Sequence, residues 1–404
     1  MPAVQRIAVA YDCLYPYTTG GGERLYRAYA ERLQRSGRSV DYLTTVQWDD
    51  RPVGEPFHVV PVTGRLRLYG PNGVRRTAAA LAFAWALFKS LRRRRKEYDA
   101  VIVSGLPVLN VFAVRAALAR SGVRVVVDYL EVWGRNQWAE YAGPLTGTVA
   151  WLLQRAAIAL TDTATCHSQL TARQLRTERY RGELLISPGL IEDSACAEFV
   201  PSPGAPPYVL YAGRHIPDKQ VDKLPAAVAH ARRSLPDLRL VILGTGPTSD
   251  AVRDAVARAD GTSWADLPGF VSEERLEELM ANAACLVNPS RREGYGLVVV
   301  EASAHGTPVV LVEGSGNAAT ELIAPGVNGF LAPDAGTPAL GDAIVRAVGG
   351  GDPLRDTTRQ WYEEAVRTRT VDRTVSAILA SLDETTPHSP DPRARGGIEE
   401  ESPS

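Results

Sequence analysis

Two series of short apolar segments alternate with helical patterns along this chain, and this alternation limits the folds open to it. In the first series, residues 6–10, 40–44, 100–104 and 124–128 read as strands, and helical stretches lie between them. Residues 22–36 form the first such stretch, with Leu25, Tyr29 and Leu33 on one side. Strands that alternate with helices predict a parallel sheet covered by helices on both faces.

The pattern pauses at a proline-rich segment and then starts again. Residues 201–207 read PSPGAPP, and new apolar strands follow at 208–212, 238–243, 285–288 and 309–312. We therefore predict an α/β protein of two Rossmann-like, doubly wound domains, 1–200 and 208–383, joined by the linker 201–207. The strands of both domains would end at one central cleft, where such sheets bind ligands. Residues 384–404 have few apolar side chains to bury, so we predict a disordered tail.

Composition excludes several classes of function. A length of 404 residues fits two domains better than one. The formal net charge of −1 favours neither a nucleic acid nor an acidic partner. The four cysteines form no C-x-x-C pair, and the first residues lack the features of a secretory signal. These features predict a cytoplasmic protein.

Two glutamates stand eight positions apart in the stretch SRREGYGLVVVEASAHGTPVV, residues 290–310. Gly294 and Gly296 suit a tight loop, and Gly306 suits the end of a helix. This pattern places Glu293 in the loop and Glu301 inside a short helix.

Basic residues and glycines follow the predicted strands of the second domain. Arg214 and Lys219 follow its first strand, and Gly244 and Gly246 follow its second. A forked guanidinium, an ammonium and the backbone N–H groups of a helix that starts near Leu297 would suit a diphosphate. Carboxylates repel phosphate, so Glu293 and Glu301 would face the hydroxyl groups of sugars. A ligand with hydroxyls on both sides of a diphosphate is a nucleotide-sugar.

These motifs, in this order, resemble the retaining GT-B glycosyltransferases of family four, a group that includes sucrose synthases and glycosyltransferases of cell-envelope glycans. The resemblance covers nearly the whole chain. It rests on TTGGGERLYRAYAERLQRSGRSVDYLT, on Gly213 and Arg214 with Lys219, on LGTGP, on LPGFVSEERLEELMANAACLVNPS, on E-x7-E at 293 to 301, and on GTPVV and NGFL.

The resemblance implies a role for each matching residue. Arg214 and Lys219 would hold the diphosphate, and Glu301 would hold the ribose. Glu293 and the backbone of Gly294, Tyr295, Gly296 and Leu297 would hold the transferred sugar, while Gly20, Gly21 and Gly22 would approach the diphosphate from the first domain. The last helix of the second domain would pack back on the first.

One departure from the family concerns the sugar. Members often carry a histidine near Leu130, and its contact would here pass to Asp128, Glu131 or Arg135.

The expected function is that of a retaining hexosyltransferase, which moves a sugar from a nucleotide-diphosphate-sugar to an acceptor hydroxyl in cell-envelope glycan or natural-product biosynthesis. The acceptor would be a sugar, a lipid or a small molecule. No D-x-D motif occurs, so neither a metal nor another cofactor is expected. A GT-B nucleotide-sugar epimerase and a non-catalytic nucleotide-sugar-binding relative stay open, whereas a dinucleotide dehydrogenase fits poorly because GTGPTS lacks the third glycine of its fingerprint. The sequence names neither the nucleotide, the sugar nor the acceptor.

One stretch resembles a membrane-surface segment. Residues 74–99 hold about a dozen apolar residues between arginines, too few to span a bilayer. We favour a buried helix with a solvated basic end, and residues 74–96 leave open a peripheral contact at the inner face of the membrane.

Overall fold

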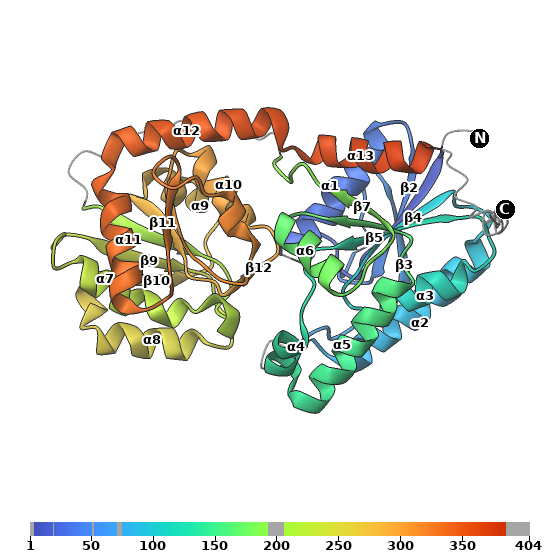
Figure 1. Cartoon of the computed structure of the whole chain (residues 1–404), viewed down its shortest axis with the longest axis horizontal. Coiled ribbons are helices and arrows are strands. Elements are labelled where there is room, and N and C mark those ends of the chain that lie inside the picture. Colours follow the sequence, from blue (N-terminus) through green and yellow to red (C-terminus); the bar gives the residue numbers. More distant parts are fainter. Residues whose placement is uncertain (1–3, 19, 51, 71–74, 193–205, 385–404) are drawn as a thin grey trace, which may run out of the picture.

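The first domain is built on a seven-stranded sheet in which all neighbouring strands are parallel (Figure 1). The computed structural model describes residues 4–18, 20–50, 52–70, 75–192 and 206–384. The strand order is β3-β2-β1-β4-β5-β6-β7. The strands are β1 (Arg6–Ala10), β2 (Ser39–Thr45), β3 (His58–Thr63), β4 (Ala100–Ser104), β5 (Arg124–Tyr129), β6 (Thr163–Cys166) and β7 (Glu183–Ile186).

Helices cover both faces of this sheet because its strands are apolar on both sides. Ile7 and Val9 of β1 join the core under α1 (Gly21–Arg35), while Ala8 and Ala10 join the core on the opposite face. That opposite core contains side chains of α2 (Thr77–Arg94), α3 (Leu109–Ala117), α5 (Pro144–Ala159) and α6 (Gln169–Thr177). The short helix α4 (Arg135–Ala142) precedes α5.

The second domain repeats this plan on a six-stranded parallel sheet of order β10-β9-β8-β11-β13-β15. Its strands are β8 (Tyr208–Ala212), β9 (Arg239–Leu243), β10 (Ala265–Gly269), β11 (Cys285–Asn288), β13 (Val309–Val312) and β15 (Gly329–Ala332). One face carries α7 (Leu224–Ala231), α8 (Ser249–Arg258) and α11 (Thr337–Gly349), and the other carries α9 (Glu273–Asn282), α10 (Leu297–Ala304) and α12 (Gly351–Thr368). The α/β fold of two Rossmann-like domains is confirmed.

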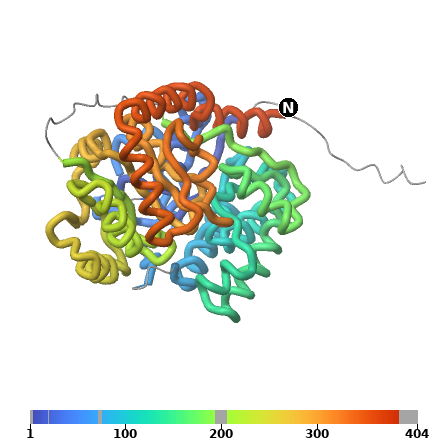
Figure 2. The backbone as a smooth tube through the Cα atoms, turned by 60° about the vertical axis from the view of Figure 1, so that its left-hand side comes forward, coloured from blue at the N-terminus to red at the C-terminus, as the bar shows by residue number. Residues whose placement is uncertain are grey.

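The chain returns to the first domain at its end. Helix α12 runs along the second domain and α13 (Val371–Asp383) lies over the first, as Figures 1 and 2 show. Val375 and Ile378 of α13 join the core under α1, and the backbone of Val371 donates to the oxygen of Ile191 at 3.1 Å. Residues 201–205 of the predicted linker and 385–404 of the predicted tail lie outside the described residues.

Most of the predicted strands are confirmed. The strands at 6–10, 100–104, 208–212, 285–288 and 309–312 have the predicted bounds, and Glu301 lies in α10, which ends before Gly306 at φ +68°. The prediction for Glu293 was wrong in one respect. Glu293 lies in the two-residue strand β12 (Arg292–Glu293), because its backbone pairs with β14 (Gly316–Asn317). Within the described residues, no helix is long and apolar enough to cross a membrane.

Candidate active site

The loops after β8 and β9 are pressed together at the carboxyl edge of the second sheet. A Cβ on Gly244 would lie 2.1 Å from the oxygen of Gly213, and one on Gly246 would lie 2.3 Å from the oxygen of His215. Glycine is therefore needed at 244 and 246 for the two loops to touch. Arg214 stands between Gly213 and His215 in the loop after β8, and its side chain is exposed.

Lys219 and Glu293 form an ion pair beside this edge. The Lys219 ammonium contacts Oε1 of Glu293, which also accepts a hydrogen bond from Nδ2 of Asn288 at 2.8 Å. Burial opposes ionisation of Glu293, but the charge of Lys219 and the hydrogen bonds from Lys219, Asn288 and Ser290 outweigh it and hold its pKa below the usual value. Glu293 is thus a fixed carboxylate, and Lys219 reaches it from the short turn Pro217–Lys219.

The glycine loop at residues 20–22 of the first domain approaches the glycine loop at residues 294–296 of the second, at the start of α10. Gly296 has φ +100°, and a Cβ there would lie 2.5 Å from the Cβ of Ala319, so only glycine allows this entry into the helix. From the first domain, Gly21 approaches the same place, because a Cβ on it would lie 3.4 Å from Cδ1 of Leu297. Gly20 caps α1, and Gly22 packs on the hydroxyl of Tyr11.

Tyr295 lies between Gly294 and Gly296, and its side chain contacts the first domain. The Tyr295 hydroxyl accepts a hydrogen bond from the Leu190 N–H at 3.1 Å.

Glu301 is held across the domain boundary by Arg24 of α1. Nη1 of Arg24 lies 2.5 Å from Oε1 of Glu301. Both side chains line a cavity of about 160 Å³ that continues between α9 and α10. Its walls combine the apolar side chains of Leu276, Met280 and Val300 with the carboxylates of Glu273 and Glu277.

Glu131 faces Glu293 from the first domain. A Cβ on Gly294 would lie 3.0 Å from Cγ of Glu131 and 2.7 Å from the oxygen of Leu130, so the end of β5 packs directly on the loop after Glu293. Glu131 accepts a hydrogen bond from Nε1 of Trp133 at 2.7 Å. Burial raises the pKa of Glu131, the Trp133 bond lowers it, and the charge of Glu293 raises it further, with a net increase. Both carboxyl groups line one small cavity.

Arg292 of the second domain contacts the first domain beside Glu131 and Glu293. Its side chain is buried, Nη2 lies 2.9 Å from Oδ1 of Asp218, and Nη1 donates to the oxygen of Gln137 at 3.3 Å. The guanidinium also lies 4.9 Å from the centre of the Trp133 ring. Glu131 and Glu293 are therefore surrounded by contacts that join the domains.

Two predicted sugar contacts lie away from this pair. Asp128 is fully buried, accepts from the hydroxyls of Tyr26 at 2.7 Å and Thr165 at 2.5 Å, and lies 2.8 Å from Nε2 of His167. Burial raises the pKa of Asp128, but His167 and these hydrogen bonds lower it below the ordinary value. This is a network inside the first domain. Arg135 is exposed at the start of α4.

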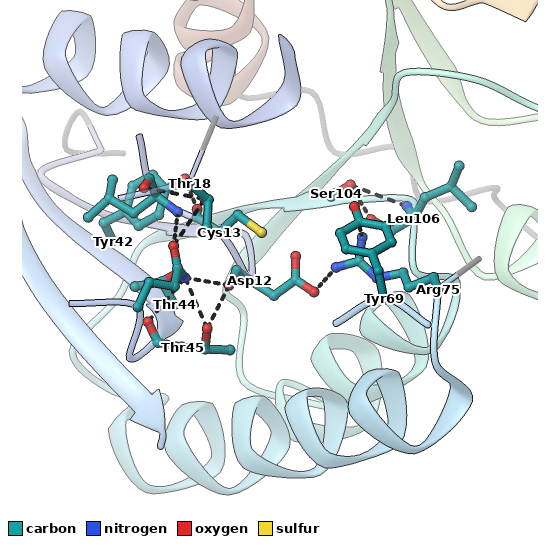
Figure 3. Close-up of polar contacts among 12 residues, drawn as sticks. Asp12, Cys13, Thr18, Tyr42, Thr44, Thr45, Tyr69, Arg75, Ser104 and Leu106 are labelled. Carbon is teal, nitrogen blue, oxygen red and sulfur yellow. Dashed lines mark hydrogen bonds and ion pairs between the residues drawn. The ribbon is translucent and has the colours of Figure 1, made fainter. Parts of the chain in front are cut away.

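A second polar cluster lies at the carboxyl edge of the first sheet (Figure 3). Asp12 follows β1, and its Oδ2 pairs with Nη2 of Arg75, whose Nη1 lies 3.4 Å from the hydroxyl of Tyr69. Within the described residues, Oδ1 of Asp12 and Nε of Arg75 have no hydrogen-bond partner. Burial raises the pKa of Tyr69 to about 12, while the charge of Arg214 acts in the opposite direction. The charge of Arg214 in the second domain therefore acts on this cluster of the first domain.

Sequence reasoning missed these first-domain partners. Asp12 follows a predicted strand by two residues, a signal that could have indicated it, and Arg75 stood out only as a basic flank of an apolar segment. Arg24 gave no signal, because its partner is far away in the sequence. No cluster of His, Cys, Asp and Glu suited to a metal ion occurs among the described residues.

Known families match both domains. Residues 20–186 match the family described as "Glycosyl transferase 4-like domain", and residues 206–349 match "Glycosyl transferases group 1". Each domain thus has its own match, and together the two cover most of the chain.

Individual relatives differ in how much they share with this chain. The alpha-D-kanosaminyltransferase of Streptomyces kanamyceticus is 31% identical over 140 residues, which are 35% of this chain and 36% of that protein. The match therefore spans little more than a third of that relative's length. The GDP-mannose-dependent alpha-mannosyltransferase of Mycobacterium tuberculosis is 27% identical over 81% of this chain and 84% of its own length.

A solved structure extends the likeness to the whole fold. The sucrose-phosphate synthase of Thermosynechococcus elongatus superimposes with a TM-score of 0.77 over 94% of this chain and 99% of that chain, at 18% identity. Its two-domain arrangement is that of the GT-B fold. The chain is therefore built of two glycosyltransferase domains, one of the glycosyl transferase 4-like family and one of group 1, in a GT-B fold.

Proposed function

We propose that this protein is a retaining glycosyltransferase that moves a hexose from a nucleoside-diphosphate-sugar to an acceptor hydroxyl. The observation that carries the proposal is the grouping of Arg214, the Lys219–Glu293 pair and the start of α10 at one sheet edge, opposite Gly21. Cations and a helix N-terminus suit the diphosphate, and a fixed carboxylate suits the hydroxyls of the sugar.

Each part of the donor would have its own contacts. The diphosphate would lie between Arg214, Lys219 and the backbone of Gly296 and Leu297, with Gly20 to Gly22 covering it. The ribose would hydrogen-bond to Glu301, and the base would enter the cavity between α9 and α10. The name of the mycobacterial relative, a GDP-mannose-dependent enzyme, supports a nucleotide-sugar donor.

The transferred sugar would lie against Glu293 and Glu131. Leu130 offers no polar group where relatives of this fold often carry a histidine, whereas Glu131 contacts the Gly294 loop. Burial raises its pKa, so Glu131 keeps its proton to a higher pH than an exposed glutamate, and the protonated carboxyl can donate as well as accept a hydrogen bond. Asp128 and Arg135 are not part of this proposal.

The reaction would proceed on one face of the sugar. The bond from the anomeric carbon to the phosphate oxygen breaks, the acceptor oxygen bonds to the same face, and the departing phosphate takes the acceptor proton. Arg214 and Lys219 would stabilise the charge that builds on that phosphate, an effect of about 3 kcal/mol for one well-placed donor. Asp12, Arg75 and Tyr69 would border the acceptor.

Two alternatives make different predictions. An epimerase would convert the nucleotide-sugar to a new epimer without any acceptor, and a non-catalytic relative would bind the donor without turnover. The donor is found first by thermal shift with a panel of UDP-, GDP- and ADP-sugars, because a ligand raises the melting temperature in proportion to its affinity. Nuclear magnetic resonance of the product then decides the stereochemistry. A product with the inverted anomeric configuration contradicts the proposal.

We also propose a peripheral contact between the basic end of α2 and an anionic lipid surface, with the enzyme at the cytoplasmic face of the membrane. Lys89, Arg92 and Arg93 have exposed side chains on this helix. Each Lys or Arg close to an anionic membrane adds on the order of 1 kcal/mol of attraction.

A further inference from the structure

Helices α2, α3 and α5 form one layer on the first sheet, and none of the three contains an Asp or Glu. Leu87 of α2, Val111 of α3 and Ile158 of α5 join the same core on that face of the sheet. Figure 1 shows the three helices together at the lower right of the first domain. Their outer surfaces therefore point in one direction, and their own side chains are neutral or basic, although Arg115 of α3 and Arg155 of α5 pair with Asp162 and Glu178 beside the layer.

Helix α5 exposes large apolar side chains over most of its length and buries a large apolar one, Ile158, only near its end. Leu145, Val149 and Leu152 are 84%, 56% and 53% exposed, and they recur at helical spacing. The buried positions of this helix include Gly147 and Gln154. An ordinary surface helix exposes mainly polar side chains, so the row of exposed apolar side chains on α5 suits an apolar environment.

Helix α2 changes from apolar to basic along its outer face. Leu81 and Trp85 are 55% and 60% exposed, and Lys89, Arg92 and Arg93 follow on the next turns. Trp85 stacks on Phe88 with ring centres 5.4 Å apart. An exposed tryptophan next to cations is typical of a side chain at a lipid headgroup boundary.

We infer that the outer face of the α2, α3 and α5 layer docks on an anionic lipid bilayer, with α5 inserting its leucines among the acyl chains. Charge complementarity favours lipid over a second copy of this chain. A symmetric dimer through this face would bring the same basic residues of both copies together, and like charges oppose association. An anionic bilayer satisfies the cations and the apolar face at once.

The position of the layer fits the proposed function. The N–H of Arg75, two residues before α2, donates to the hydroxyl of Tyr141 in α4 at 3.1 Å. The first residues of α2 therefore lie next to the Asp12–Arg75 cluster. A bilayer docked on this layer would lie close to the acceptor, which we propose to be bordered by Asp12, Arg75 and Tyr69. The inference rests on the proposed lipid contact of α2 and extends it to α5, but it does not depend on sugar transfer.

The test is sedimentation of the full chain with phosphatidylcholine vesicles, with and without phosphatidylglycerol, in the absence of donor. The wild type should pellet with the anionic vesicles, and added salt should weaken this binding. The triple variant Leu145→Ser, Val149→Ser, Leu152→Ser should bind at least a hundredfold more weakly, on the order expected when several buried CH₂ groups are lost. Val53→Ser with Val327→Ser, two exposed apolar positions outside the layer, should bind like the wild type.

A second variant separates the contribution of charge. Lys89→Gln, Arg92→Gln, Arg93→Gln should lose about fivefold per cation on anionic vesicles. The matched control Arg253→Gln, Arg275→Gln, Arg367→Gln removes three exposed cations from the second domain and should leave binding unchanged. Loss with the charge variant alone would support α2 and overturn the role of α5.

Other outcomes also contradict the inference. Equal pelleting of the wild type and the α5 variant would do so, as would a wild-type dimer in light scattering that the α5 variant makes monomeric. Melting temperatures check that every variant folds. Quenching of tryptophan fluorescence by brominated lipids gives an independent readout, and it should fall in Trp85→Tyr, which leaves Trp151 of α5 as the other tryptophan of the layer. Donor binding by thermal shift without vesicles tests the sugar-transfer proposal separately.

Discussion

Arg24 of α1 and Glu301 of α10 join the two domains through an ion pair of 2.5 Å. The pair occupies the carboxylate that we propose for the ribose hydroxyls, so a bound nucleotide would compete with Arg24 for Glu301. We predict that Arg24→Ala strengthens the binding of a nucleoside diphosphate by up to about fivefold, because a partly exposed pair contributes about 1 kcal/mol at most. Calorimetry with UDP and GDP measures this.

Arg27→Ala is the matched control for this prediction. Arg27 lies one turn further along α1 and pairs with Glu31 and Glu55 inside the first domain. Its loss should leave nucleotide affinity unchanged. Weaker binding by the Arg24 variant would mean that Arg24 itself contacts the nucleotide.

The two glutamates of the E-x7-E motif should separate in binding experiments. Glu301→Ala should weaken the free nucleoside diphosphate as much as the full donor, because the ribose is present in both. Glu293→Ala should not weaken the free nucleotide, which lacks the sugar. Titration of both variants with nucleotide and with nucleotide-sugar provides the comparison. Equal losses on the free nucleotide would reverse or remove these assignments.

The strands that the sequence predicted well are continuous apolar runs, such as VVLV in β13 and CLVN in β11. Others could not be found this way. TATC in β6 is short and polar, and ADLPG in β10 ends in Pro and Gly. These segments are strands because they pair with β5 and β9, a tertiary effect that overrides their own preferences.

The site shows the same division between local and long-range information. The order of motifs brought Arg214, Lys219, Glu293 and Glu301 to one region, because loops after parallel strands meet at one edge. It could not show which partners they take. Asp128 is the opposite case, since β5 continues through Tyr129 and directs the Asp128 carboxylate to Tyr26 and His167 inside the domain.

Glu131 should make stability depend on pH. Its pKa is raised in the folded protein above the reference value of 4.5, mainly by burial. Its favourable contribution is therefore complete below that value and is lost as pH rises through the folded pKa. We predict that Glu131→Gln raises the melting temperature relative to wild type at about pH 8 and much less at about pH 4. Calorimetric scans measure both, and Glu364→Gln, an exposed glutamate, should show no such trend.

The buried Asp128 network should matter for folding. Asp128→Asn removes the charge beside His167 and disturbs the bonds from Tyr26 and Thr165, so we predict a loss of about 3 kcal/mol or more in the free energy of unfolding. Urea denaturation measures the change. Asp162→Asn, at an exposed pair with Arg115, should cost about 0.5 kcal/mol or less. A small effect at Asp128 would show that its network adds little to stability.

The effect of replacing Lys219 or Arg214 on kcat distinguishes a transferase from a protein that only binds the donor. A residue that only holds the donor contributes equally before and during the reaction, whereas one that meets growing charge on the phosphate acts mainly on kcat. We predict that Lys219→Ala and Arg214→Ala each lower kcat by roughly two orders of magnitude or more. Arg214→Lys should restore only part of the rate, because lysine lacks the planar fork.

Lys223→Ala is the matched control for this prediction. Lys223 is an exposed lysine four residues after Lys219, and its variant should turn over normally. Rates are measured at saturating donor, and near-normal turnover of the Lys219 and Arg214 variants would place the diphosphate elsewhere.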